Sequence, residues 1–116
     1  MRRKTARTFE RQHDEAAWFA RVAAELKEKG DAGRAADLYD WALDRELRAI
    51  NLLLRAGSDD PAILLPLYLN AARWAVGCAR IDKARHLVEE ALRLQPSEEQ
   101  RKELEGLIKQ TGMKKR

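Results

Sequence analysis

Residues 18–26 read WFARVAAEL and are followed by Gly30, Ala35, Tyr39 and Ala42. A second stretch, residues 68–75, reads YLNAARWA and is followed by Ala79, Ala84, Val88, Ala91 and Pro96. In both, a small residue lies mid-way along the first segment, and two alanines seven positions apart bracket a larger residue on the second. Small residues are needed where two helices cross closely, and larger ones fill the space between them. The repeated pattern therefore predicts two helical hairpins.

The composition of the 116-residue chain favours an all-α fold of one domain. Alanine, leucine, arginine and glutamate dominate, and all four are good helix formers. Only three prolines and six glycines interrupt the chain, so loops must be few and short. No segment alternates apolar and polar residues with the period of a strand.

Five helices are expected, at about residues 8–29, 32–56, 66–78, 82–94 and 97–110. Their short connections imply antiparallel neighbours. Gly30 ends the first helix and Asp31 caps the second. Because proline is tolerated in a first turn but breaks a helix interior, the third helix is predicted to start near Pro66, with residues 61–65 forming a turn or a separate helical piece. Ser97 and Gln100 form a capping box for the fifth helix.

The repeated pattern resembles the tetratricopeptide repeat, a family with an aromatic residue and a small residue in its first helix, a glycine at the turn, alanines at the helix crossing and a final proline. The first unit matches at Phe19, Val22, Ala23, Leu26, Gly30, Ala35, Tyr39 and Ala42. The second matches at Tyr68, Ala71, Ala72, Ala84, Val88, Ala91 and Pro96. It has Ala79 in place of the turn glycine. Ala35 and Ala84 lie 49 residues apart, against a family period of ~34, so the units are divergent.

The resemblance implies a short right-handed superhelix of stacked hairpins. The expected organisation is a basic tail in 1–7, a helical domain in 8–110 and a basic tail in 111–116, with units at about 8–56 and 65–96 and a capping helix at 97–110. Two units are fewer than the roughly three that a solenoid needs. Either the long second helix supplies the missing core, or the open face of the first helix packs on a partner or on a second copy, which would make a homodimer.

The resemblance also implies a function, that of an adaptor or assembly module which binds a segment of a partner protein on its concave face. The positions of this chain that match that face are Ala20, Ala24, Lys27, Leu69, Arg73 and Val76, with Asn70 and Arg73 as the groups that would grip a polar part of the partner. Ala24 stands where the family's carboxylate clamp has an asparagine, so that clamp is not predicted. Trp74 is expected in the core, and Trp18 and Trp41 are candidate interface anchors.

Positive charge gathers at the two ends of the chain, at Arg2, Arg3, Lys4, Arg7, Lys114, Lys115 and Arg116. The formal net charge of +4 belongs to these ends, and the part between them is close to neutral or slightly acidic. Basic ends can bind phosphates or an anionic surface. The alternative function is therefore that of an accessory protein which binds nucleic acid or an anionic surface through its basic ends. The simpler interpretation of these charges is that they only keep the chain in solution.

No pattern of catalytic residues stands out, so an enzyme is not expected, and neither a cofactor nor a metal is expected. Glu10 and His13 form one E-x-x-H pair, but a di-iron bundle needs two such pairs and two further glutamates. A surface salt-bridge face explains the pair better. The single cysteine, Cys78, excludes an internal disulfide and agrees with a reducing compartment. With no apolar leader and no segment long enough to span a membrane, the expected location is the cytoplasm.

Overall fold

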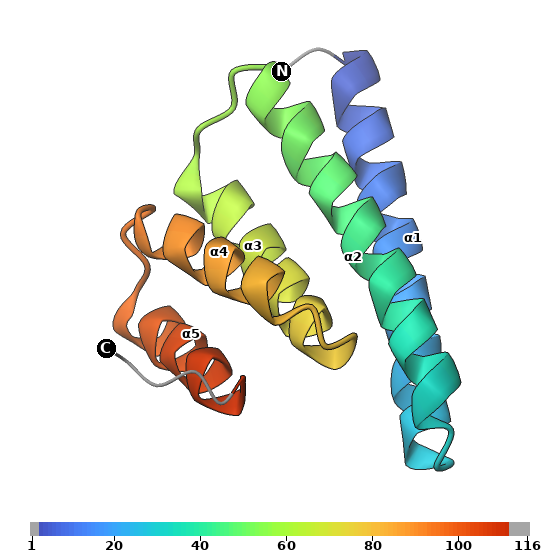
Figure 1. Cartoon of the computed structure of the whole chain (residues 1–116). Helices are drawn as coiled ribbons and strands as arrows, with labels where there is room; N and C mark the ends of the chain where they lie inside the picture. Colours follow the sequence, from blue (N-terminus) through green and yellow to red (C-terminus); the bar gives the residue numbers. More distant parts are fainter. Residues whose placement is uncertain (1–2, 112–116) are drawn as a thin grey trace.

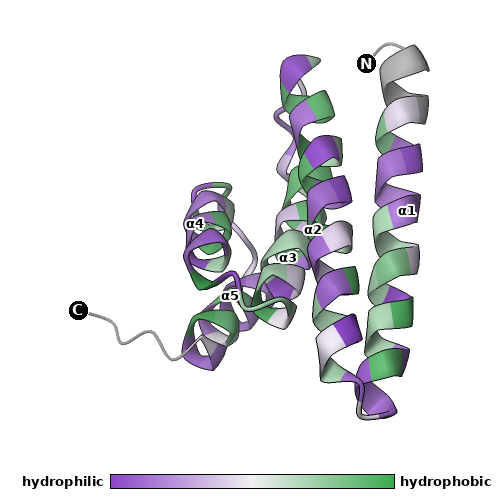
Figure 2. Ribbon diagram, turned by 45° about the vertical axis from the view of Figure 1, so that its right-hand side comes forward, coloured by the Kyte–Doolittle hydropathy of each residue, from purple (hydrophilic) through white to green (hydrophobic). Residues whose placement is uncertain are grey.

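The computed structural model describes the backbone of residues 3–111 and the side chains of residues 8–111. This part of the chain is all-α, as predicted, and forms five helices. They are α1 (Arg3–Glu28), α2 (Ala32–Arg55), α3 (Pro61–Gly77), α4 (Ile81–Leu92) and α5 (Glu98–Gln110). Figure 1 shows α1 and α2 side by side as a long hairpin, with α3, α4 and α5 gathered next to it. Figure 2 shows α2 between α1 and α3, and α2 packs on both.

The first hairpin closes on a seam of alanines. Ala16 and Ala23 of α1 and Ala35, Ala42 and Ala49 of α2 recur at seven-residue spacing, and none is more than 2% exposed. Residues seven positions apart lie on nearly the same side of a helix. Their methyl groups therefore form a narrow stripe that allows the two backbones to approach closely.

The core of larger side chains lies beside this hairpin, around α3. The buried members from α3 include Leu64, Leu65, Leu67, Tyr68 and Leu69, and they meet Leu43, Ile50 and Leu53 of α2, Leu87 and Val88 of α4, and Leu104 and Leu107 of α5. The central position of α3 agrees with its sequence, which is apolar nearly all round.

The first and third helices end in the same type of turn. After α1, Gly30 has φ 85°, and the N–H of the next residue donates to the carbonyl of Leu26 at 2.9 Å. After α3, Ala79 has φ 60°, and the N–H of the next residue donates to the carbonyl of Ala75 at 2.8 Å. Both endings need a residue in the left-handed region. Gly57, with φ 79°, ends α2 in the same way, so this turn is common to the first three helices.

The start of α1 differs from the prediction. The helix begins at Arg3 and not near Thr8, so residues 3–7 are its first turns and not a separate tail. The expected boundary followed the first apolar residue, Phe9. Helix formation needs no apolar residue, however, and no glycine or proline occurs before Gly30.

The start of α3 also differs, because Pro66 lies inside the helix and not at its beginning. Asp60 caps the helix by accepting a hydrogen bond from the N–H of Ala62 at 3.0 Å, and Pro61 occupies the first turn. The burial of Leu64 and Leu65 holds this segment against the core. Pro66 is exposed and removes only the hydrogen bond to the carbonyl of the exposed Ala62, which water can replace.

The capping box predicted for α5 is confirmed. Ser97 Oγ accepts a hydrogen bond from the N–H of Gln100 at 3.1 Å, and Gln100 Oε1 accepts one from the N–H of Ser97 at 2.9 Å. Leu104 and Leu107 then lie on the face of α5 that is buried against the core. The predicted cap of this helix is therefore observed.

Candidate functional site

The first hairpin carries an exposed group of rings, which we call the aromatic patch: Trp18 and Phe19 of α1 and Trp41 of α2. Trp18 is 55% exposed and Trp41 is 52% exposed. The ring centroid of Phe19 lies 5.3 Å from that of Trp18 and 5.6 Å from that of Trp41, and both pairs meet edge to face. Such contacts hold the rings in place although they face water. Both predicted interface anchors are therefore exposed, and they belong to one patch.

The aromatic patch points away from the core. Trp41 and Ile50 are nine residues apart on α2, which at 3.6 residues per turn places them about 180° apart around the helix axis. Ile50 is buried in the core against α3, so Trp41 lies on the opposite flank of the hairpin. We call this the outer flank.

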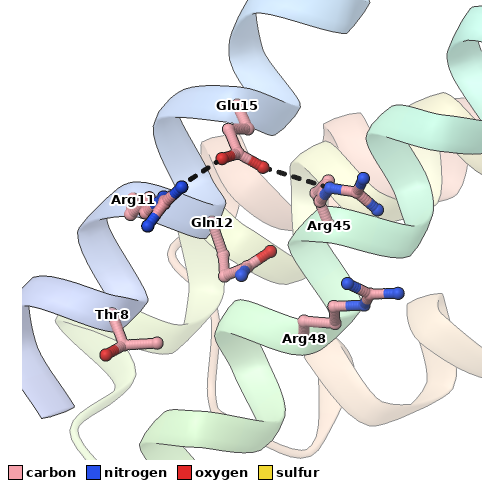
Figure 3. Close-up of a pocket in the computed structure, with 6 residues that line it drawn as sticks. All are labelled: Thr8, Arg11, Gln12, Glu15, Arg45 and Arg48. Atoms are coloured by element: carbon pink, nitrogen blue, oxygen red, sulfur yellow. Dashed lines mark hydrogen bonds and ion pairs between the residues drawn. The ribbon is translucent and has the colours of Figure 1, made fainter.

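An open groove of about 370 Å³ lies between α1 and α2 on the outer flank (Figure 3). It is lined by Thr8, Arg11, Gln12 and Glu15 of α1 and by Arg45 and Arg48 of α2. A neighbouring hollow adds Asn51, Leu52 and Arg55. Arg45 belongs to both features, because its guanidinium carbon lies 5.8 Å from the ring centroid of Phe19 and its Nε donates to Glu15 at 3.1 Å. We call the two hollows together the arginine groove.

Ion pairs neutralise only part of the positive charge in this groove. Glu15 pairs with Arg11 at 3.3 Å and with Arg45 at 3.1 Å. Asp44 pairs with Arg45 at 2.7 Å and with Arg48 at 3.1 Å. Two carboxylates therefore serve three guanidinium groups, and the groove keeps an excess of positive charge.

Two further groups in the groove lack partners within the described part of the chain. Arg55, at the end of α2, forms no ion pair there. The Oε1 atom of Gln12 is buried and accepts no hydrogen bond there. A buried acceptor without a donor costs about 1–3 kcal/mol.

A buried carboxylate on the other flank joins the hairpin to α3. Glu46 of α2 is 0% exposed. It accepts hydrogen bonds from Nδ1 of His13 at 2.9 and 3.1 Å and from Nδ2 of Asn70 at 3.1 Å. The bond to Glu46 raises the pKa of His13, although partial burial acts in the opposite direction. We call His13, Glu46 and Asn70 the polar bridge, because it ties α1, α2 and α3 together.

Sequence reasoning missed Glu46. The available signal was its spacing: it lies three residues after Leu43 and four before Ile50, both of which are buried. A charged residue at such a position is buried only when it is paired. Its partners come from two other helices, so the pairing could not be read from local sequence.

The polar residues predicted on the concave face take part in contacts within the protein. Asn70 donates to Glu46 and accepts a hydrogen bond from Nη1 of Arg73 at 3.0 Å. Arg73 also pairs with Glu103 of α5. The other members are buried Leu69, partly buried Ala20 and Val76, and exposed Ala24 and Lys27. The structure thus brings Asn70 and Arg73 together, but as part of the packing between helices.

The basic ends lie largely outside the described part of the chain. Arg3, Lys4 and Arg7 belong to the backbone of α1, but their side chains are not described. Arg2, Lys114, Lys115 and Arg116 lie outside the described residues altogether. The groove on the outer flank supplies a basic surface that sequence reasoning did not identify.

The other residues considered in the sequence analysis make packing contacts and hydrogen bonds within the protein. Trp74, predicted in the core, is partly buried against it. The thiol of Cys78 donates to the carbonyl of Ala75 at 3.6 Å, and burial raises its pKa, which is opposite to the shift of a reactive thiol. His13 bonds to Glu46 and not to Glu10. Between residues 8 and 111, no three His, Cys, Asp or Glu side chains are grouped so that they could hold a metal ion.

Comparisons with known proteins give no relative for this chain. Nothing matches among the protein-family models, the curated proteins or the solved structures. Within residues 3–111 no helix combines the length and the apolar character needed to cross a membrane. The surface itself therefore provides the argument about function.

Proposed function

We propose that this chain is a non-catalytic protein-interaction module, an adaptor or assembly unit, whose contact surface is the aromatic patch. The observation that carries the proposal is that Trp18 and Trp41, on adjacent helices, are both more than half exposed and both contact Phe19. Tryptophan and arginine are among the residue types most enriched in binding hot spots. Arg45, which lies over Phe19, places both types in one surface.

The geometry favours the outer flank over the concave face as the place of contact. Asn70 and Arg73 are hydrogen-bonded to each other, and each also binds a carboxylate, that of Glu46 or Glu103. A partner on the concave face would have to compete with these bonds. Trp18 and Trp41 have no such competitor, because most of their surface is in contact with water. Covering that surface releases water from apolar area, which favours association.

We also propose that the two hairpins are divergent units of the tetratricopeptide type, with α5 as a cap. The buried alanines at the predicted crossing points support this relationship: Ala35, Ala42, Ala84 and Ala91. We propose that the protein acts in the cytoplasm, because a chain with a single cysteine forms no internal disulfide and agrees with a reducing compartment.

The proposal is tested by affinity capture from a cytosolic extract with three forms of the protein: wild type, Trp18→Ala/Trp41→Ala and Leu92→Ala. Leu92 is the matched control, an apolar side chain that is 38% exposed on α4. A partner that wild type and Leu92→Ala retain and the double variant loses is the expected result. Equal recovery of all captured proteins by the double variant contradicts the proposal.

Light scattering over a dilution series decides whether the partner is a second copy. A wild-type dimer that the double tryptophan variant converts to a monomer would identify the module as self-assembling. A wild-type monomer would direct the search to a foreign protein.

A further inference from the structure

We infer that the partner is an acidic amphipathic segment of another protein, with apolar side chains on the aromatic patch and carboxylates in the arginine groove. The inference rests on the proposed function and adds the chemistry of the partner. It depends on two observations: the patch and the groove share Arg45, and the groove has an excess of positive charge.

Arg45 makes the two features one continuous surface. Its guanidinium group lies over Phe19 of the patch, and the same side chain lines the groove and bonds to Glu15. A segment seated on Trp18 and Trp41 and following the groove between α1 and α2 therefore passes directly from apolar to basic surroundings.

The spacing along α2 sets the spacing required in the partner. Trp41 and Arg48 are seven residues apart, about 10 Å along the helix, and Trp41 and Arg55 are about 21 Å apart. A helical partner lying parallel to α2 would therefore carry carboxylates about seven and fourteen residues from its apolar anchor. Such a segment presents one face that is apolar at one end and acidic at the other.

Charge favours an acidic partner over a second copy of this chain. Arg11, Arg45 and Arg48 share only Glu15 and Asp44, and Arg55 has no ion-pair partner among the described residues. Two copies facing each other through the outer flank would bring two positive excesses together. A carboxylate, in contrast, can pair with a guanidinium group through two hydrogen bonds.

The test is a selection from a library of random 16-residue peptides displayed on phage, carried out on the full chain. Wild type is expected to enrich peptides that combine apolar residues with aspartate or glutamate about seven residues away. The most enriched peptide is then synthesised and titrated against Arg48→Glu/Arg55→Glu, which reverses two charges in the groove. Its affinity should fall at least about tenfold, since even one lost charged contact is worth about 1.4 kcal/mol at such a site.

A matched control separates the groove from overall charge. Arg85→Glu/Arg101→Glu makes the same change in net charge on exposed residues of α4 and α5 and should leave the affinity within about twofold, because screening weakens distant charges. A version of the peptide with lysines in place of its acidic residues should bind Arg48→Glu/Arg55→Glu better than wild type. If the reversed variant loses helical circular dichroism, Arg48→Gln/Arg55→Gln replaces it.

The outcomes distinguish the two proposals. Peptides that lose affinity for Trp18→Ala/Trp41→Ala but show no acidic enrichment and no response to the charge reversal overturn the inference and leave the proposed function standing. If no peptide is enriched, or if the tryptophan variant binds the selected peptide as well as wild type does, the proposed function fails as well. A 12-nucleotide single-stranded RNA that binds more tightly than the peptide and is lost on charge reversal would replace the acidic segment by a nucleic acid.

Discussion

The contact between α1 and α2 and the core around α3 are built from side chains of different size. The hairpin closes on alanines that are at most 2% exposed, and its bulkiest rings, Trp18 and Trp41, remain outside. The body buries its bulky residues, among them Leu64, Leu104 and Val88. None of the largest fully buried side chains within residues 8–111 comes from α1. An α1–α2 seam made of methyl groups thus leaves Trp18 and Trp41 on the outer flank, whereas Leu43, Ile50 and Leu53 of α2 are buried in the core.

The difference also explains why α1 needs a specific connection to the body. The alanines of the seam do not belong to the core around α3, and α1 packs mainly on α2. The polar bridge supplies a directional link, because His13 of α1 and Asn70 of α3 bond to the same carboxylate of Glu46. Hydrogen bonds set the relative position of helices more narrowly than apolar contact does.

The largest expected effect is a cavity in the body. Leu64→Ala should lower the free energy of unfolding by about 2–5 kcal/mol, because Leu64 is 1% exposed and its removal leaves unfilled space. Trp41→Ala removes a larger side chain from the outer flank and should change the same quantity by about 1 kcal/mol or less. Urea unfolding followed by circular dichroism measures both. Equal losses would show that the aromatic patch is part of the core.

The next largest effect is expected from overfilling the alanine seam. Ala42→Leu should lower the free energy of unfolding by about 1–3 kcal/mol, because Ala42 is 0% exposed where the two helices meet. Ala24→Leu is the matched control: the same change at an exposed position of α1 should have an effect within about 0.5 kcal/mol. A seam that accepts leucine at position 42 without loss would not be close-packed.

A smaller change in the free energy of unfolding is expected from substitutions in the turns that end α1 and α3. Ala79→Gly should raise the free energy of unfolding by about 1 kcal/mol, because alanine at φ 60° is strained and glycine is not. Gly30→Ala should lower it by about the same amount, because Gly30 has φ 85°. Thermal unfolding of the two variants checks these opposite signs. Changes of the same sign would show that the two turns are not equivalent.

The smallest effect is expected from pH. Glu46 raises the pKa of His13 in the folded state above its ordinary value of about 6.5. The protonated His13–Glu46 pair therefore adds its full share to the free energy of unfolding below pH ~6.5. This stabilisation is lost as pH rises through the higher pKa of His13 in the folded state. Stability should be greater at pH 6 than at pH 9 by less than about 1 kcal/mol, because the side chain of His13 is 35% exposed.

The control for this prediction is His13→Gln, which keeps a polar side chain but does not titrate. Chemical unfolding at both pH values should show a smaller difference for this variant than for the wild-type protein. An identical pH dependence of the two proteins would mean that the polar bridge does not set it.

Local features were predicted well and long-range features were not. Asp31 and Ser97 were identified as caps because a cap acts within three residues of its own position. Pro66 was misplaced because its local cost was outweighed by the burial of the leucines before it. Trp18 and Trp41 were selected as anchors from residue type, but only the fold brings them to the same ring of Phe19.

The sequence by itself determined the five helices, most of their ends and the pairing of neighbours into hairpins. The physical reason is that helix formers, caps, breakers and apolar spacing act over a few residues. The tertiary structure alone decided that Glu46 is buried between His13 and Asn70, and that the outer flank joins an aromatic patch to an arginine groove. These features join residues far apart in the chain, and their distances depend on the crossing and register of whole helices.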